Sequence, residues 1–362
     1  MTDRLNRTPL YNLHLAAGAR MVEFGGWEMP VQYQGIVAEH QAVRSKVGMF
    51  DVSHMGKFTF KGKNILSSLQ NLVPSNLARL KPNQAQYTVL LNPEAGIIDD
   101  LIFYYHGGDD WSAIVNAATR LKDKAWIEQH LDGELIDRSD ELILIAVQGK
   151  DSIEALQPFV TDNLSEIKRF GHRQTQVLGS DSFIARTGYT GEDGFEVMMD
   201  IAIGQQLWQS LINAGVTPCG LGCRDTLRLE AGLHLYGQDM NESITPLEAD
   251  LAWLVHLQEK GDFIGRSKLE SQKKLGVDRQ LVALEMTGRN IARHDYQIRH
   301  NGETVGTITS GTMSPTLGKP IALAYVPTNL AALGQELQVQ IRNQDSPAKV
   351  IKRPFYKSIH TL

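Results

Sequence analysis

The chain has 362 residues, of which 42% are hydrophobic and 21% are charged, and its formal net charge is −5. This length exceeds what one hydrophobic core usually organises, so we expect two or three domains, and the excess of acid disfavours general binding to nucleic acid. No apolar run reaches the ~18 residues of a membrane span, and the polar start MTDRLNR does not resemble a signal peptide, so we expect a cytoplasmic protein.

Short runs rich in β-branched and aromatic residues alternate with stretches of helical periodicity in the N-terminal part of the chain. Strands are predicted at residues 57–60, 87–91, 97–105, 111–116, 142–148, 182–187 and 195–199. Helices are predicted at residues 119–131, 152–159 and 203–214. This order indicates an α+β region rather than a regular βαβ repeat.

The run GIIDDLIFYY at residues 96–105 places two adjacent carboxylates inside an apolar strand. Because side chains alternate between the faces of a strand, Asp99 and Asp100 point in opposite directions, and each face carries one acid. An ionised carboxylate taken out of water costs on the order of several kcal/mol unless a partner meets it, so at least one of the two must bind something. A buried backbone group or an arginine would satisfy it as well as a ligand would, and the residues alone do not separate Asp99 from Asp100.

A further acid follows the glycine-rich turn GYTGEDG at residues 188–194. The turn matches neither the Walker pattern nor the dinucleotide fingerprint, so it does not predict a phosphate site. Its glycines permit positive φ angles and a close approach of the backbone to a ligand. Glu196 lies between Phe195 and Val197 in the next apolar strand, where either a ligand or a structural arginine would explain a carboxylate.

A helix is predicted at residues 224–235, directly after a Gly-Leu-Gly sequence. Arg224 and Arg228 share one face at helical spacing, and Asp225 can pair with Arg228 three residues on. Guanidinium groups bind carboxylates bidentately, so this face suits a carboxylate ligand. We predict a structural role for Arg228 and a functional role for Arg224.

The two cysteines of the chain, Cys219 and Cys223, precede this helix. No further cysteine or His-rich tract accompanies them, so we expect reduced thiols rather than a metal site or a disulfide.

The polar stretch ESQKKLGVDR at residues 270–279 is the best candidate for a domain boundary, because short β-like runs and Gly/Pro turns follow it. We therefore expect one region at residues 1–275 and a small β domain at residues 280–362. Basic residues cluster near its end, around Phe355 and Tyr356, at Lys349, Lys352, Arg353 and Lys357. This cluster suits an acidic partner or a polyanionic ligand, and a solvated basic edge is the alternative.

Taken together, these segments resemble the aminomethyltransferase family, the T-proteins of the glycine cleavage system. The resemblance covers nearly the whole chain and rests on residues 8–11 (TPLY), 24–30 (FGGWEMP), 48–55 (GMFDVSHM), 96–104, 186–196, 221–232, 235–238 (LYGQ) and 308–318 (ITSGTMSPTLG). It implies an α+β fold of three lobes with a central channel, in which tetrahydrofolate lies beside an acid and a C-terminal β-barrel domain closes the site.

The resemblance also implies roles for single residues. Asp100 matches the essential acid of the family, and the positions that match folate-site residues are Tyr87, Tyr104, Asn116, Tyr189, Glu196, Arg224 and Tyr236. Reduced pterin offers ring N–H donors that carboxylates can accept, and its faces suit aromatic neighbours. The roles of Tyr356 and Lys357 stay open.

By the same resemblance, the substrate is an aminomethyl group on the lipoyl arm of the H-protein, and tetrahydrofolate accepts the one-carbon unit. The implied products are ammonia, 5,10-methylenetetrahydrofolate and the dihydrolipoyl carrier, with no metal.

Two relatives of this fold give alternatives. Folate-binding proteins that assist iron–sulfur assembly or RNA modification carry a Lys-Gly-Cys-Tyr motif, whereas this chain has RTGYT at residues 186–190. Folate domains of flavin-linked dimethylglycine or sarcosine oxidases accompany a dinucleotide fingerprint, which this chain lacks.

Overall fold

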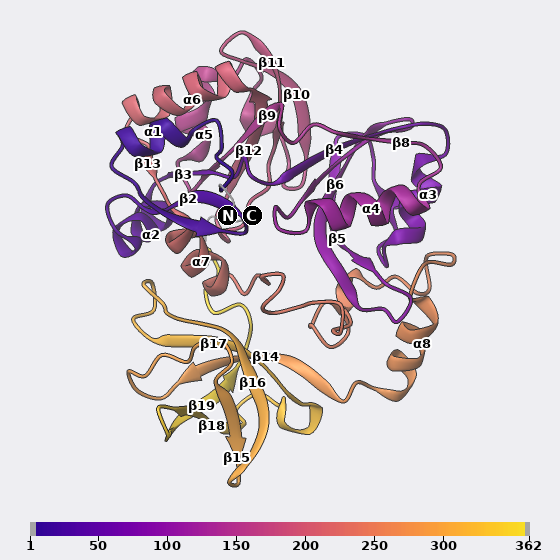
Figure 1. Ribbon diagram of the computed structural model, residues 1–362, viewed down its shortest axis with the longest axis vertical. Coiled ribbons are helices and arrows are strands. Elements are labelled where there is room, and N and C mark those ends of the chain that lie inside the picture. The colour runs from indigo at the N-terminus through magenta and orange to yellow at the C-terminus, as the bar shows by residue number, and fades with distance from the viewer. Residues whose placement is uncertain (1–4, 359–362) are drawn as a thin grey trace.

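The computed structural model describes residues 5–358, and Figure 1 shows three lobes. The first lobe contains a six-stranded sheet in the order β10-β11-β12-β9-β3-β13, and the second contains a five-stranded sheet in the order β5-β6-β7-β4-β8. The third lobe is a closed barrel in the order β14-β17-β16-β15-β18-β19. The α+β fold with a C-terminal β-barrel is thus confirmed.

The first lobe is assembled from separate parts of the chain. Its sheet consists of β3 (Gly48–Asp51), β9 (Leu142–Gln148), β10 (His172–Val177), β11 (Ser180–Ala185), β12 (Gly194–Asp200) and β13 (Thr217–Pro218). The hairpin β1 (Arg20–Phe24) and β2 (Trp27–Gln32) and the helices α1 (Tyr11–Ala16), α2 (Ile36–Ser45), α5 (Ser152–Leu156), α6 (Ile201–Asn213) and α7 (Leu221–Glu230) complete it, with short 3₁₀ turns at Gln157–Phe159 and Leu164–Glu166.

The second lobe is one continuous insertion between β3 and β9. Its strands are β4 (Gly56–Lys61), β5 (Gln84–Leu91), β6 (Ile97–Gly107), β7 (Asp110–Val115) and β8 (Glu134–Asp137), and its helices are α3 (Ile65–Leu72), α4 (Arg120–His130) and a 3₁₀ turn at Leu77–Arg79. Long antiparallel pairing of β6 with both β5 and β7 makes β6 the central support of this sheet.

A connecting segment leads to the barrel. It contains a 3₁₀ turn at Ala252–Leu254 and the helix α8 (Arg266–Leu275). The barrel consists of β14 (Arg279–Met286), β15 (Gln297–His300), β16 (Glu303–Met313), β17 (Pro320–Pro327), β18 (Glu336–Ile341) and β19 (Gln344–Ile351), with a 3₁₀ turn at Thr328–Leu330. Closure of the barrel removes the exposed edges that an open sheet of these strands would have.

Strand alternation on β6 separates two environments. Leu101 and Phe103, on the same face as Asp99, pack into a core that includes residues of α3 and α4. Ile102 and Tyr104, on the same face as Asp100, pack instead against residues of the first lobe. Asp100 therefore faces the junction of two lobes, whereas Asp99 faces the interior of one.

The barrel docks on helix α7 through buried polar groups. Glu230 at the end of α7 accepts hydrogen bonds from Ser314 Oγ at 2.5 Å and from Thr316 N and Oγ1 at 3.0 and 2.7 Å. The same carboxylate lies 3.0 Å from Arg44 and 3.1 Å from His40, both on α2. Glu230 thus joins α2, α7 and the barrel segment that contains the ITSGTMSPTLG sequence.

Several predicted boundaries differ from the structure. The helix predicted at residues 224–235 begins earlier, at Leu221, and ends at Glu230, because Gly232 with φ +67° turns the chain away. The stretch at residues 270–279, predicted as a domain boundary, contains the last part of α8, which continues to Leu275. Within residues 5–358, no helix is long and apolar enough to cross a membrane.

Candidate active site

Asp100 is held by two side chains from neighbouring strands. The Tyr87 hydroxyl donates to Asp100 Oδ2 at 2.9 Å, and Asn116 Nδ2 donates to Asp100 Oδ1 at 2.8 Å. Tyr87 belongs to β5 and Asn116 follows the end of β7, so the sheet presents both donors to the central strand. The structure therefore brings three of the predicted site residues into one hydrogen-bonded group.

The environment of Asp100 favours proton binding at neutral pH. Burial, followed by the charge of Asp99, raises the pKa of Asp100 to about 7, although the hydrogen bonds from Tyr87 and Asn116 oppose this shift. Burial and the Asp100 carboxylate in turn raise the pKa of Tyr87 well above its usual value, so its hydroxyl remains a donor. The side chain of Asp100 is only partly buried. A group of this kind can accept or release a proton close to pH 7.

Asp99 has a different set of partners. It is fully buried and accepts hydrogen bonds from Thr119 Oγ1 at 2.7 Å and from Asn116 Nδ2 at 2.9 Å. Asn116 therefore bridges the two adjacent aspartates. This burial excludes contact between Asp99 and a bound molecule. It therefore distinguishes the roles of Asp99 and Asp100, which the sequence alone did not.

Arg224 and Tyr189 form a second group, near Glu196. The Arg224 guanidinium lies 4.6 Å from the centre of the Tyr189 ring, and Nη1 is buried with no hydrogen-bond partner among the described residues. Burial lowers the pKa of Arg224, while Glu196 and Tyr189 counteract this shift. Glu196 accepts a hydrogen bond from Thr187 Oγ1 at 2.5 Å. The group has a cation, an anion and an aromatic face, and the unsatisfied Nη1 can bind an acceptor of a ligand.

The two groups are electrostatically connected. The charge of Asp100 contributes to the raised pKa of Tyr189, and Tyr189 contributes to that of Tyr87. Both effects are smaller than burial, which is the main cause in each case. The predicted residues of β5, β6, the glycine-rich turn and α7 thus lie around one region of the molecule.

Two further predicted residues lie differently. Tyr104, a predicted folate neighbour, is 1% exposed and packs edge-on against Phe183 at 5.0 Å; burial, followed by the Glu196 carboxylate, raises its pKa, so it lies beside Glu196 but is covered in this structure. The reason is that the first lobe covers the part of β6 that contains Ile102 and Tyr104. Tyr236 is partly buried, donates to the Ile97 carbonyl at 3.2 Å and accepts from Lys122 Nζ at 2.9 Å. It supports the start of β6 and does not touch Asp100.

Other residues near the site were not predicted. Trp253 is 59% exposed and stacks on Tyr87 at 6.1 Å, which places an accessible aromatic face beside the partner of Asp100. His54 is buried beside Phe24, and burial lowers its pKa to about 4, so it is a neutral imidazole near Arg224. Trp253 belongs to no periodic sequence pattern that could have indicated its position beside the site. His54 stands in the GMFDVSHM sequence, which could have drawn attention to it.

Arg228 has structural partners only. It pairs with Asp225 and with Asp239, each at 2.8 Å, and donates to Ser310 Oγ at 2.9 Å. The predicted pairing with Asp225 is confirmed, and Arg228 additionally ties α7 to the barrel.

The cysteines are buried free thiols beside Glu39. The Glu39 carboxylate already accepts the backbone N–H groups of Tyr33, Gly35 and Gly220. Burial raises the pKa of the Cys223 thiol well above its usual value, which favours the protonated form rather than a metal-binding thiolate. This cluster is therefore part of the packing between α2 and α7.

The fold and site together define a class of protein: two α+β lobes and a C-terminal barrel, with one acid of raised pKa between the lobes. Residues 10–259 match the GCVT N-terminal domain, and residues 279–357 match the glycine cleavage T-protein C-terminal barrel domain. The chain belongs to the family of glycine cleavage system aminomethyltransferases, the T-proteins.

Individual relatives agree with this assignment. An aminomethyltransferase of Nostoc sp. is 61% identical over 98% of this chain and 97% of its own length, and one of Picosynechococcus sp. is 59% identical over 98% and 99%. The crystal structure of glycine cleavage system aminomethyltransferase T from Bartonella henselae superposes with a TM-score of 0.93 at 34% identity, covering 98% of this chain and 99% of that one. The chain is an aminomethyltransferase of a family that uses tetrahydrofolate as a substrate.

Proposed function

We propose that Asp100 is the central acid in the transfer of the one-carbon unit from the aminomethyl-lipoyl arm of the H-protein to tetrahydrofolate. The observation that carries this proposal is the hydrogen-bonded group of Tyr87, Asp100 and Asn116, with an Asp100 pKa of about 7. A partly accessible carboxylate of this kind can accept a hydrogen bond from a folate nitrogen and stabilise the positive charge that develops there.

The proposed reaction requires proton transfers that a carboxyl group of this kind can perform. Two folate nitrogens each form a bond to the carbon, while the bonds from carbon to the amine and to sulfur break. The two N–H hydrogens of folate end on ammonia and on the lipoyl sulfur. The protein must therefore move protons from folate to two leaving groups, and Asp100, whose pKa is near 7, can take and return them. Positioning in a water-poor site suppresses the competing hydrolysis.

The folate is proposed to bind between Asp100 and the group of Glu196, Arg224 and Tyr189. The unpartnered Nη1 of Arg224 supports this position, because an unsatisfied buried guanidinium nitrogen requires an acceptor. Tyr236 is proposed to support the site through β6, and Tyr104 through packing beneath it.

The partner is proposed to be the lipoylated H-protein, which delivers its arm by a transient encounter, and the reaction is proposed to take place in the cytoplasm. Residues 1–275 are proposed to bind folate, and residues 280–362 to close the site as a separate domain. The basic residues near the C-terminus are the proposed contact with the H-protein.

Ammonia release from the aminomethylated carrier tests the proposed function. Release should be fast with tetrahydrofolate and slow without it, and methylenetetrahydrofolate should form in equal amount. Equal rates with and without folate would contradict transfer to folate, and folate binding without any ammonia release would indicate a binding protein of the same fold.

A further inference from the structure

A fully buried carboxyl group lies behind the proposed active site and has no evident role there. Asp123 is in the first turn of α4 and is 0% exposed, on the same helix face as Ile127. Within residues 5–358, no N–H or O–H donor of another side chain meets either of its carboxyl oxygens in hydrogen-bond geometry. A buried group without partners requires an explanation, because its desolvation is otherwise uncompensated.

The neighbour of Asp123 is a second buried carboxyl group, that of Asp99. The nearby Thr119 hydroxyl has a single hydrogen, and Thr119 Oγ1 lies 2.7 Å from Asp99 Oδ2, so that hydrogen is used on Asp99. Burial, then the charge of Asp99 and a hydrogen bond with it, raise the pKa of Asp123 to about 10, although the Thr119 hydroxyl beside it acts in the opposite direction. One proton shared by the two carboxyl groups satisfies both, since a protonated carboxyl is a donor and Asp99 is an acceptor.

We infer that Asp123 is a protonated carboxylic acid that donates a hydrogen bond to Asp99, and that it acts as a positioning residue for Asp100 through Asn116. The positioning part rests on the proposed role of Asp100 in the reaction. The protonation part does not, because it follows from the buried carboxyl pair alone.

The path from Asp123 to Asp100 consists of single hydrogen bonds with defined direction. Asn116 Nδ2 has two hydrogens, and it lies 2.9 Å from Asp99 Oδ1, 2.8 Å from Asp100 Oδ1 and 3.2 Å from the Asp100 carbonyl oxygen, so its two shortest contacts are to the two carboxyl groups. An Asp99 fixed as an acceptor holds the Asn116 amide so that its second N–H points at Asp100. The orientation of Asp100 therefore depends on Asp99, whose charge also contributes to the raised pKa of Asp100.

Charged groups from the surrounding elements do not replace the proton. Lys122 on α4 weakly lowers the pKa of Asp123, but its Nζ is bound to the Ile98 carbonyl, to Tyr236 and to Glu242 at 2.8–2.9 Å. On the other side, the groups that face the pair are Asp100, with Tyr87 behind it, and Tyr236. Among these groups only Lys122 is a cation, and its three partners leave no hydrogen for either carboxylate.

Stability as a function of pH tests the proton. The folded pKa of Asp123, about 10, lies above the usual 3.8 of an aspartate, so wild type must take up a proton on folding and loses stability as pH rises between these values. Asp123→Asn keeps the shape and the donor but needs no proton. Its urea midpoint, relative to wild type, should therefore increase steadily from pH 5 to pH 9. A difference that is constant or decreasing with pH would overturn the protonated state.

An infrared measurement covers the case in which Asp123→Asn does not fold. Wild type at pH 9 should retain a protonated-carboxyl C=O stretch, where ordinary carboxylates are ionised. Absence of that band in the folded enzyme would equally overturn the inference.

Activity tests the positioning role. Asp123→Ala removes the donor to Asp99, which should loosen Asn116 and weaken its hydrogen bond to Asp100, a bond that lowers the pKa of Asp100. The acidic limb of kcat/KM should then shift by about one pH unit to higher pH, with kcat reduced about tenfold to a hundredfold by the misplaced carboxylate. Asp123→Asn should recover most of the rate and restore the limb.

Ile127→Ala is the matched control, because Ile127 is equally buried on the same face of α4, one turn further on. It should lower the urea midpoint and leave the acidic limb in place. An equal shift in Ile127→Ala, or no shift in a folded Asp123→Ala, would overturn the positioning role. Near-normal activity of Asp100→Asn would instead contradict the proposed function, and the urea result on Asp123 would still stand.

Discussion

At the scale of single residues, two adjacent aspartates have opposite surroundings. Asp99 is enclosed by Thr119, Asn116 and Asp123, whereas Asp100 faces the junction of two lobes and keeps accessible surface. The alternation of a strand is sufficient to create this difference, because it sends neighbouring side chains to opposite faces. The consequence is that one carboxylate supports the site and the other is available to a substrate.

Substitution of Asp100 by Asn should reduce turnover by roughly two to four orders of magnitude, because the charge and the proton-accepting group are lost while the shape is kept. Folding should be unaffected, as judged by circular dichroism and melting temperature. Steady-state ammonia release measures the effect, and folate-dependent turnover close to wild type would refute the role of Asp100.

Asp99→Asn is the matched comparison. Its new amide hydrogens would face the donors Thr119 and Asn116, so we expect a loss of stability of about 1–3 kcal/mol. Turnover should fall less than in Asp100→Asn, and removal of the Asp99 charge should shift the acidic limb to lower pH.

The group of Glu196, Arg224 and Tyr189 leads to a different prediction. Glu196→Ala and Arg224→Ala should raise the folate requirement more than they lower the maximal rate, because they remove interactions made with the bound substrate in its ground state. Calorimetric titration of both variants measures the affinity, and folate should raise the melting temperature of wild type in a concentration-dependent way. Affinities equal to wild type would assign both residues to the fold.

The sequence predicted this site in part. The two acids in an apolar strand and the unusual Arg224 were evident from the residue pattern, but Asp100 was distinguished from Asp99 only by family resemblance. Asp123 was missed, although its spacing of four from Ile127 places it on the buried face of a helix. Tyr104 was placed at the site by family resemblance, and neither the resemblance nor strand alternation shows what covers that face.

At the scale of elements, helix α7 connects the site to the rest of the protein. Arg224 near its start lies over the Tyr189 ring, Arg228 in its middle binds Asp239, and Glu230 at its end binds the barrel. The boundaries of α7 were predicted wrongly, because the apolar pattern of residues 224–235 continues past the true end of the helix at Glu230. It also gives no sign that the helix begins directly after Gly220. The short strand β3 was missed for a related reason, since its four buried residues show no alternation.

Glu230→Gln should lower the free energy of unfolding by about 3 kcal/mol, since Arg44 and His40 lose a buried anionic partner. Burial favours the protonated acid, but hydrogen bonds from His40 and Ser314 outweigh it and lower the pKa of Glu230 to about 2. Its contribution to stability is therefore present at neutral pH and lost as pH falls from 4.5, the usual pKa of a glutamate, towards 2. Urea unfolding at several pH values measures this.

Glu259→Gln serves as the control, because the Glu259–Arg79 pair is exposed on both sides and should contribute little. Equal losses in the two variants, or a Glu230→Gln loss that persists at pH 2, would contradict the role of Glu230 as a buried anchor.

At the scale of the whole molecule, the substrate arrives on another protein. A transient encounter is small and partly electrostatic, so its association rate should fall with salt. Lys352 and Lys357 are exposed, while the neighbouring Arg353 pairs with Asp250 and Tyr356 lies under Arg44 at 4.1 Å. Lys352 and Lys357, like Lys349 on β19, are therefore exposed to a partner.

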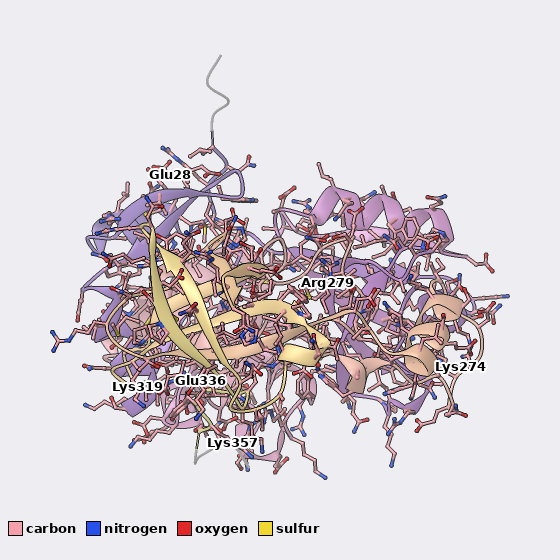
Figure 2. The ribbon with its side chains drawn as sticks, turned by 90° about the horizontal axis from the view of Figure 1, so that it is seen from below. Glu28, Lys274, Arg279, Lys319, Glu336 and Lys357 are labelled. Atoms are coloured by element: carbon pink, nitrogen blue, oxygen red, sulfur yellow. The ribbon has the colours of Figure 1, made fainter. Side chains whose placement is uncertain are left out.

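Charge reversal at Lys352 and Lys357 should raise the apparent requirement for the carrier and leave folate affinity unchanged. The matched control is charge reversal at Lys273 and Lys274 on α8, which are equally exposed; in Figure 2, Lys274 lies on a different part of the molecule from Lys357. A free aminomethyl-lipoate analogue provides the second control. An equal loss of activity with the carrier and with the analogue would contradict the proposed contact with the H-protein. So would equal effects of charge reversal at the two lysine pairs.

The interrupted first lobe has a consequence for synthesis of the chain on the ribosome. All strands of the second lobe lie between Gly56 and Asp137, so this sheet is complete soon after those residues emerge. The sheet of the first lobe holds β3 unpaired until β9 arrives and gains its last strand only at Thr217–Pro218. Protease protection of stalled nascent chains should therefore appear in the inserted lobe first, in the lobe that surrounds it second, and in the barrel last, after β19 has paired with β14.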